Sequence, residues 1–168
     1  FSLLPFPVSL LLPKGFVIRF PAMLKIRVPA TSANLGPGFD CLGIALNLYL
    51  EVTATPSKRD HFVYTGQGEI ADSPDNLMHE GFRAAYSSLN QKAPTITFEV
   101  NNPIPLARGL GSSSAALVAG IALADAMMEG ALGRDGVFQL AAEMEGHPDN
   151  VAPAIYGGFT ASVQMNNG

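Results

Sequence analysis

The sequence predicts an α+β fold, in which a mostly antiparallel sheet packs against helices. Three segments alternate apolar and polar residues as half-buried strands do: residues 24–28, 45–53 and 95–100. A fourth segment, residues 115–128, is apolar around its whole circumference apart from Gly120 and Asp125, which is typical of a helix buried on most sides. These patterns predict helices that cover one sheet.

Composition limits the classes of function. Of the 168 residues, 48% are hydrophobic and 14% are charged, against a typical charged fraction of about 25%. Either much of the surface is apolar, or a partner domain covers part of it. The net charge of −4 provides no basic footprint for nucleic acid. The single cysteine, Cys41, cannot form an internal disulfide, which suits a reducing, cytoplasmic location.

Residues 1–22 differ from the rest of the chain. They are apolar but contain four prolines, a frequency that argues against a membrane helix of about 20 residues. We interpret them as a disordered leader of doubtful origin, with Met23 as the natural start. Residues 23–168 then form one domain.

The first half of that domain reads as strands and turns. We expect Pro29 to end the first strand, and residues 30–40 to form a glycine- and proline-rich loop. A long strand within residues 41–55 is followed by a polar turn, and residues 61–65 are its expected hairpin partner. The lone His61 is interpreted as an exposed strand residue.

Helix signals follow. Ser73 is the expected N-cap, with Pro74 at the first helical position. His79 falls outside the apolar face of this helix and is expected to be solvated. Residues 135–145 form a short amphipathic helix, and residues 155–163 read as a final strand.

A glycine-serine turn leads directly into the apolar helix. Gly109 and Gly111 lack a Cβ atom, so the backbone can adopt positive φ and a ligand can approach closely. Ser112, Ser113 and Ser114 lie where the helix begins, and the unpaired N–H groups there attract anions, phosphate above all. The alternative is a flexible surface loop. No lysine follows Gly111, which excludes a Walker A loop, and a third glycine of a dinucleotide motif is missing.

Two carboxylates near the end of the helix at residues 135–145 are distinguished by their position on a helical wheel. At about 100° per residue, Glu145 falls on the inward side and Glu143 on the far side. A carboxylate that points at a core needs a partner or a cation. The alternative is a frayed helix end with both glutamates solvated.

Two motifs resemble those of a known family. Pro105-x-x-x-Gly-Leu-Gly-Ser-Ser-x-Ala is similar to the phosphate-binding motif of the GHMP kinases, which phosphorylate small alcohols and acids with ATP. Pro29-Ala-Thr-x-Ala-Asn-Leu-Gly-x-Gly-Phe-Asp and the later His147-x-Asp-Asn resemble motifs as the homoserine kinases carry them. The resemblance covers residues 23–168 and implies a GHMP kinase N-terminal lobe that phosphorylates the hydroxyl of L-homoserine.

The resemblance also implies roles for individual residues. Asn76 would contact the nucleotide base or ribose, or else only support the first helical turn. The ATP phosphates would be bound by Pro105, Arg108, Gly109, Leu110, Gly111, Ser112, Ser113 and Ser114, although Arg108 could equally be solvated. Ser113 and Glu145 would hold Mg²⁺ and act as the catalytic residues. The substrate would be bound by Asn34, Asp40, His147 and Asn150. Without the resemblance, residues 30–40 and 147–150 would read as ordinary turns.

GHMP kinases have a second, C-terminal lobe that helps to close the active site. The sequence ends before such a lobe, so the expected partners are L-homoserine and the protein's own C-terminal lobe, with a homodimer left open. Two alternatives remain. One is a GHMP kinase for another small alcohol, a sugar or mevalonate, and the other is an ATP-binding fragment without catalysis.

Overall fold

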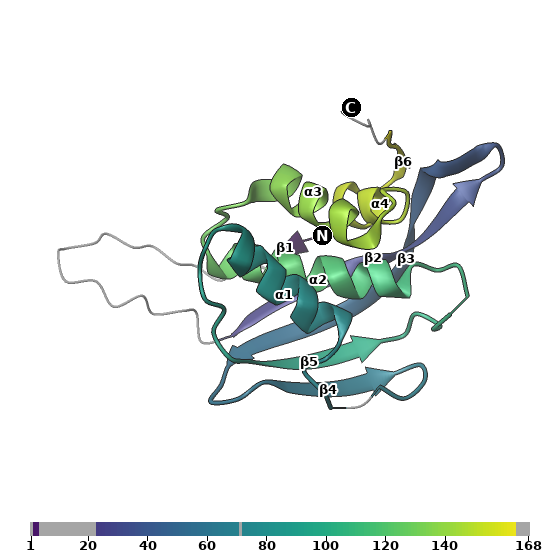
Figure 1. Cartoon of the computed structure of the whole chain (residues 1–168). Coiled ribbons are helices and arrows are strands. Elements are labelled where there is room, and N and C mark those ends of the chain that lie inside the picture. The colour runs from purple at the N-terminus through teal and green to yellow at the C-terminus, as the bar shows by residue number, and fades with distance from the viewer. Residues whose placement is uncertain (1, 4–22, 71, 164–168) are drawn as a thin grey trace.

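A computed structural model describes residues 2–3, 23–70 and 72–163 (Figure 1). A twisted sheet forms one layer, and the helices of the described residues lie together on one of its faces (Figure 1). The expected α+β class, a mostly antiparallel sheet packed against helices, is confirmed. The leader expected at residues 1–22 falls outside the described residues, apart from Ser2–Leu3, which form strand β1.

The sheet has the order β1-β2-β3-β5-β4, with β6 paired to β3 beside this path. Its strands are β1 (Ser2–Leu3), β2 (Leu24–Leu35), β3 (Gly38–Pro56), β4 (His61–Gly66), β5 (Ile96–Asn102) and β6 (Phe159–Ala161). All pairs are antiparallel except β4 with β5. The three alternating segments of the sequence lie within β2, β3 and β5, as predicted.

Strand β2 continues past Pro29, where the sequence suggested that it would end. Pro29 lies opposite Tyr49, and the register shifts between Pro29 and Thr31, so an irregularity in the pairing accommodates a residue that has no N–H to donate. The strand then runs to Leu35, which pairs with Gly38. The prediction of a loop at residues 30–40 is therefore wrong, because these residues form the end of the long β-hairpin of β2 and β3.

Strand β4 is not the hairpin partner of β3. Instead β5 lies between them, antiparallel to β3 and parallel to β4. Parallel neighbours need a crossover connection, which helix α1 supplies between β4 and β5. The inward side chains Phe98 of β5 and Phe62 of β4 pair with each other and are buried, whereas Val63 of β4 faces outward beside the exposed Glu99 and is 52% exposed.

The described residues form four helices: α1 (Leu77–Ser88), α2 (Ser112–Met127), α3 (Gly133–Glu145) and α4 (Val151–Tyr156). Helix α1 begins one turn later than expected, because Asn76 is its N-cap and Ser73 instead accepts a bond from Asp75 N. Within residues 155–163 the expected strand is reduced to β6. The first two of these residues end α4, and Gly157 then takes φ +77° and terminates the helix.

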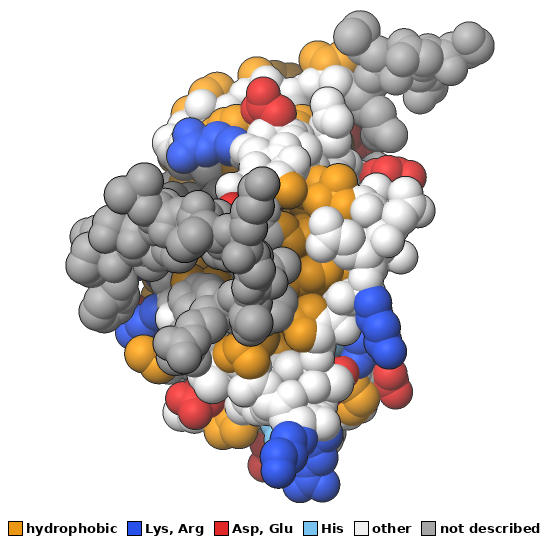
Figure 2. All heavy atoms as spheres, turned by 90° about the vertical axis from the view of Figure 1, so that its left-hand side faces the viewer, with side chains coloured by type: hydrophobic (Ala, Val, Ile, Leu, Met, Phe, Trp, Pro, Cys, Tyr) orange, Lys and Arg blue, Asp and Glu red, His pale blue; other side chains and the backbone are white. Residues whose placement is uncertain are grey.

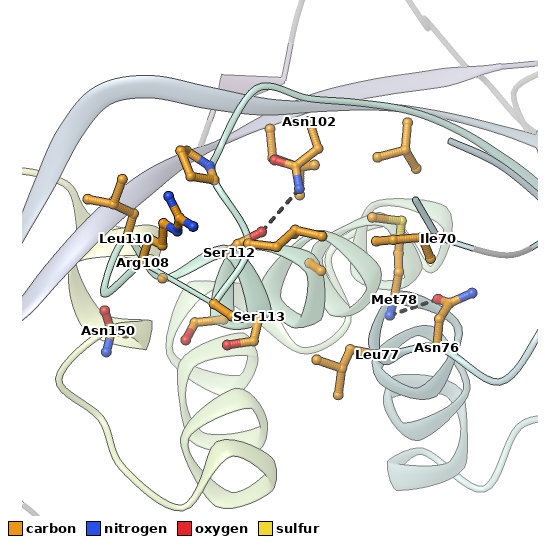
Figure 3. Close-up of a pocket in the computed structure, with 18 of the residues that line it drawn as sticks. Ile70, Asn76, Leu77, Met78, Asn102, Arg108, Leu110, Ser112, Ser113 and Asn150 are labelled. Atoms are coloured by element: carbon orange, nitrogen blue, oxygen red, sulfur yellow. Dashed lines mark hydrogen bonds between the residues drawn. The ribbon is translucent and has the colours of Figure 1, made fainter. Parts of the chain in front are cut away.

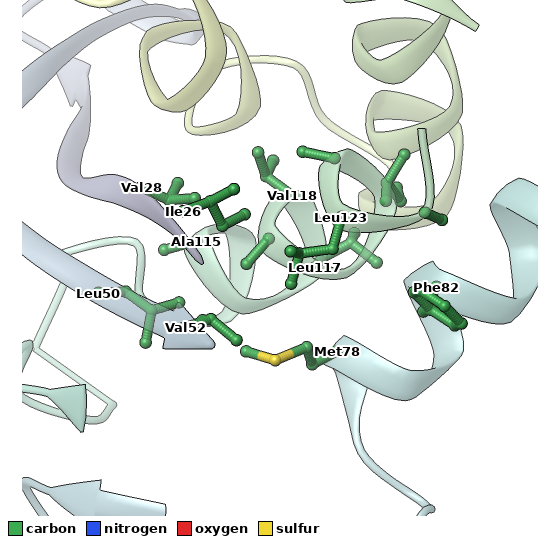
Figure 4. Packing of buried hydrophobic residues seen from close by; sticks show 14 of the residues in the cluster. Ile26, Val28, Leu50, Val52, Met78, Phe82, Ala115, Leu117, Val118 and Leu123 are labelled. Atoms are coloured by element: carbon green, nitrogen blue, oxygen red, sulfur yellow. The ribbon is translucent and has the colours of Figure 1, made fainter. Parts of the chain in front are cut away.

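Helix α2 is buried on nearly all sides because it forms the centre of the molecule. The sheet lies on one side, α1 packs along it, and α3 and α4 cover the rest (Figures 1 and 4). Leu50 and Val52 of β3 and Ile26 and Val28 of β2 face the helices in this core (Figure 4). The all-round apolar sequence of α2 is thus explained by its neighbours.

Apolar side chains are also found on the surface. Figure 2 shows hydrophobic side chains gathered on one face, with charged groups mainly toward its margins. On the projecting hairpin and β6, Phe39 is 74% exposed and Phe159 is 61% exposed. The hairpin and β6 therefore expose two large aromatic side chains on the side of the molecule that is turned away from the viewer in Figure 2. Within the described residues, no helix is long and apolar enough to cross a membrane.

The contact between α1 and α2 depends on a glycine. A Cβ atom added at Gly120 would lie 2.0 Å from the carbonyl oxygen of Met78. We therefore expect Gly120→Ala to lower the free energy of unfolding by about 2 kcal/mol, because overpacking against backbone outweighs the gain of about 1 kcal/mol in helix propensity. Urea unfolding of the full chain measures this.

Gly136→Ala is the matched control. Gly136 lies inside α3, where a Cβ would be 3.1 Å from the side chain of Leu132, the N-cap of the same helix. We expect a change of less than about 1 kcal/mol for this variant. Equal stability of the two variants would contradict a tight α1–α2 contact.

Candidate functional site

A pocket of about 600 Å³ lies between the start of α1, the loop after β5 and the start of α2 (Figure 3). Its apolar end is lined by Leu50, Phe62, Tyr64, Ile70, Leu77, Met78, Val100 and Leu106. Its polar end is lined by residues 108–114 together with Glu145 and Asn150. The pocket therefore offers an apolar cavity joined to a polar one, which suits a ligand with a flat apolar part and a charged part.

The glycine-serine loop has the conformation predicted from its sequence. Gly109 has φ +44° and Gly111 has φ +62°, both in the left-handed region. Gly111 is the N-cap of α2 and provides no side-chain cap to the helix. The first N–H groups of α2 therefore remain available at the polar end of the pocket, where they and the helix dipole favour an anion.

Thr31 of β2 joins this loop to the far end of the chain. Its N–H donates to the carbonyl of Leu110 at 3.1 Å, and its hydroxyl donates to Oδ1 of Asn150 at 2.8 Å. A Cβ atom at Gly111 would lie 2.0 Å from the Thr31 hydroxyl. Close approach is therefore the structural reason for glycine at this position, and the loop is held against β2.

Glu145 points toward the start of α2, as its position on the helix predicted, and Glu143 is exposed. Oε1 of Glu145 accepts from the hydroxyl of Ser114 at 2.8 Å and lies 3.5 Å from that of Ser113. Ser114 is 1% exposed, so its hydroxyl orients the carboxylate. Ser113 is exposed at the pocket, and its hydroxyl is available to a ligand.

The Glu145 carboxylate and the Ser113 hydroxyl are too few to hold a metal ion by themselves, but they suit Mg²⁺ that is also bound by phosphates. Among the described residues there is no group of three or more His, Cys, Asp or Glu side chains that could hold a metal ion. Mg²⁺ usually takes one or two carboxylates and completes its shell with water and substrate phosphates. One carboxylate and one hydroxyl beside an anion site match that pattern.

A second polar cluster lies beside the loop. Asn34 on the hairpin donates to Oδ2 of Asp149 at 3.0 Å and accepts from the N–H of Asp40 at 2.9 Å. Oδ1 of Asp149 accepts from the N–H of Asn150 at 2.8 Å. Three of the four predicted substrate residues are thereby connected, through residues that lie more than 100 positions apart in the sequence.

Three predicted residues have side chains without such links. The side chains of Asp40, Arg108 and His147 are exposed and make no hydrogen bond or ion pair with the part of the chain that the structure describes. Arg108 lines the pocket, whereas Asp40 and His147 lie outside its lining. Asp40 and Asn34 both have positive φ, a conformation that is common at functional sites.

Sequence reasoning missed three residues that organise the site. Thr31 and Asp149 connect the hairpin to the loop and to α4, as described above. Asn102, which is 3% exposed, donates to the hydroxyl of Ser112 at 3.1 Å and accepts from Ile104 N at 3.1 Å. Thr31 and Asp149 are fixed positions of the two motifs at residues 29–40 and 147–150, which was the signal that could have found them. Asn102 stands before Pro103, and nothing in the sequence separates it from an ordinary turn former.

Comparisons with known proteins identify the relatives of this chain. Residues 76–158 match the family described as GHMP kinases N terminal domain. A homoserine kinase of Thermus thermophilus is 59% identical over 139 residues, covering 83% of this chain and 47% of the relative. The homoserine kinase of Moorella thermoacetica is 47% identical over 144 residues, covering 84% and 49%.

The chain belongs to the GHMP kinase family. A crystal structure of homoserine kinase from Cytophaga hutchinsonii has a TM-score of 0.71 at 29% identity, covering 87% of this chain and 50% of that one. The mevalonate kinase of Methanococcus jannaschii, with a TM-score of 0.64 at 15% identity, shares the fold. This GHMP kinase chain spans about half the length of the curated relatives it matches.

The two glycines of the GHMP kinase loop should respond differently to alanine. Gly111→Ala should lower the free energy of unfolding by about 3 kcal/mol, from the left-handed backbone and from the clash with Thr31. Gly109→Ala meets open space and should lower it by only about 1–2 kcal/mol. Chemical denaturation of both variants measures the difference, and a larger loss for Gly109→Ala would refute the close contact.

Proposed function

We propose that this protein is the ATP-binding part of a homoserine kinase, which transfers the γ-phosphate of ATP to the hydroxyl of L-homoserine. One observation carries the proposal: Thr31 bonds both to Leu110 in the glycine-serine loop and to Asn150. The expected phosphate site and the expected substrate site are therefore neighbours, as phosphoryl transfer requires. The identity of 59% to a homoserine kinase supports the same substrate.

The proposed nucleotide position follows the two ends of the pocket. The adenine and ribose would occupy the apolar end, near Asn76 and Met78. The phosphates would lie against the N–H groups of Gly109, Gly111 and the first turn of α2, with Arg108 at the rim. Binding by backbone N–H groups needs no lysine, which agrees with the lack of a Walker motif.

Ser113 and Glu145 would hold Mg²⁺ between the loop and the phosphates. Bound there, the ion would neutralise charge that develops on the transferred group. Ser114 would keep the Glu145 carboxylate in place through its hydrogen bond of 2.8 Å. No other described carboxylate lies in the pocket lining, so Glu145 is the acidic ligand in this proposal.

The substrate would be bound by Asn34, Asp40, His147 and Asn150. The Asp40 carboxylate is exposed and could pair with the ammonium group of an amino acid. The homoserine hydroxyl oxygen attacks the γ-phosphorus, ADP leaves, and the hydroxyl proton passes to a phosphate oxygen. A protein base is not required, because positioning and electrostatic stabilisation provide most of the catalysis in such reactions.

The setting of this activity is also a proposal. The product, O-phospho-L-homoserine, would feed threonine biosynthesis in the cytoplasm. A C-terminal lobe would complete the site and cover the apolar hairpin around Phe39 and Phe159, which are 74% and 61% exposed. This chain covers only 47–49% of the length of these two relatives, which supports a second lobe.

The first test is a substrate panel. Protein expressed from its complete reading frame should consume ATP with L-homoserine, and should be at least about 100-fold less active on galactose and mevalonate, because those alcohols lack the ammonium group that Asp40 would bind. Formation of ADP and of phosphohomoserine measures this. Turnover of a sugar or mevalonate in preference to homoserine would favour another GHMP kinase, and MgATP binding without any transfer would favour a binding module.

Two glutamates in one helix provide the test of the magnesium site. Glu145→Gln should lower kcat on the order of 100-fold, since a metal ligand is lost while the shape is kept. Glu143→Gln changes an exposed carboxylate on the same helix and should leave kcat and thermal stability unaltered. Wild-type turnover by both Glu145→Gln and Ser113→Ala would refute the assignment.

A further inference from the structure

The amide of Asn76, at the apolar end of the pocket, is fully used in hydrogen bonds within the protein. Its Oδ1 accepts from the N–H groups of Met78 at 3.1 Å and His79 at 3.0 Å. Its Nδ2 donates to the carbonyl of Ser73 at 2.6 Å and lies 3.0 Å from Nδ1 of His79. Two lone pairs and two hydrogens are all that such an amide has, so all four positions are occupied.

These bonds determine the protonation of His79. Two backbone N–H groups point at Oδ1 of Asn76, so the amide cannot be turned around, and its NH₂ group must face the histidine. Nδ1 of His79 is therefore the acceptor, and the proton of the neutral ring is on Nε2. Nε2 is buried and has no hydrogen-bond partner of good geometry among the described residues, although the backbone of Ile96 lies close enough to favour a proton on the ring.

The ring of His79 has little freedom to adjust. Its side chain is fully buried, although the sequence pattern placed it in solvent. The ring makes a T-shaped contact with Phe98 on β5 at 4.7 Å between centroids, and its centroid lies 6.1 Å from that of Phe62 on β4. The amphipathic pattern of α1 failed here because β4 and β5 extend the buried face of that helix beyond its apolar residues.

We propose that neutral His79 is a positioning residue for nucleotide binding, because it holds Asn76 and with it the first turn of α1. That turn carries Leu77 and Met78, which line the apolar end of the pocket (Figure 3). A hydrogen on Nδ1 would face the NH₂ group of Asn76, so protonation of His79 breaks the bond and weakens nucleotide binding. The inference rests on the proposed function, since it treats this pocket as the ATP site.

The surroundings of His79 favour the neutral ring. Burial has the largest effect and lowers the pKa of His79 below its usual 6.5, and Arg83 on the same helix lowers it further. Asp60 in the β3–β4 connection, Asp72 before α1 and the backbone of Ile96 on β5 act in the opposite direction. As the pH falls, the unfolded chain binds the proton of His79 at a higher pH than the folded chain does. The contribution of the neutral ring to the free energy of unfolding is therefore present above pH 6.5 and is lost as the pH falls below it.

Two nearly isosteric substitutions isolate the acceptor. In His79→Asn, an amide oxygen can take the place of Nδ1 and does not titrate, whereas His79→Leu has the same shape without an acceptor. Both leave a similar cavity, so comparison of the two cancels the loss of packing. At pH 7.5 we expect the Leu variant to bind MgATP about 3- to 10-fold more weakly than the Asn variant, as loss of one hydrogen bond implies.

The pH dependence provides the second readout. From pH 7.5 to 5.0 the Kd of wild type for MgATP should rise more than that of His79→Asn, because only wild type carries the titrating ring. Protonation of the ATP phosphates affects both proteins equally and cancels in the comparison. His61→Gln, at a partly exposed histidine on β4, should keep the wild-type profile. Calorimetric titration of the full-length protein measures Kd, with thermal unfolding followed at each pH.

Three outcomes would overturn the inference. Equal Kd values for the Asn and Leu variants would show that the acceptor has no effect, and a wild-type pH profile in His79→Asn would show that this histidine is not the titrating group. If the Leu variant does not fold, the pH comparison alone decides. Failure of wild type to bind MgATP at pH 7.5 would overturn the proposed function itself, and the inference with it.

Discussion

The structure depends on one constraint: helix α2 must be buried along its length and yet leave its first N–H groups open. Burial comes from the sheet, α1, α3 and α4, which surround the helix. The open end comes from Gly111, which caps the helix without a side chain. Because Thr31 holds the preceding loop, the open end has a fixed position relative to β2. An anion site so placed is preorganised, and preorganised dipoles are what phosphoryl transfer uses.

The same helix brings distant parts of the chain together. Glu145 reaches the start of α2 from α3, and Asn150 reaches the loop from the turn before α4. The hairpin of β2 and β3 contributes Thr31 and Asn34 from the other side. Polar groups in these contacts are mostly paired with one another, which explains how a site made of four separate segments can be kept in one geometry.

The two ends of the pocket differ in how they are supported. At the polar end, backbone groups and short side chains are held by hydrogen bonds to β2 and α3. At the apolar end, the shape depends on the first turn of α1, and that turn depends on Asn76 and the buried ring of His79. A neutral imidazole in an apolar environment is sensitive to pH, whereas backbone bonds are not. In the proposed nucleotide complex, proton concentration would therefore affect the contacts at the two ends of the pocket unequally.

The sequence by itself determined the local features. Alternation identified the segments within β2, β3 and β5, the all-apolar run identified a buried helix, and the wheel distinguished Glu145 from Glu143. Short-range rules suffice for these because strand and helix periodicity and loop glycines act within a few residues. The motifs added the family, which the comparisons confirm.

Only the tertiary structure decided the rest. The insertion of β5 between β3 and β4, the continuation of β2 past Pro29 and the burial of His79 all depend on partners far along the chain. Thr31, Asn102 and Asp149 look like turn residues until the segments that they join are adjacent. Burial and hydrogen-bond partners are properties of the assembled layers, and local sequence patterns do not contain them.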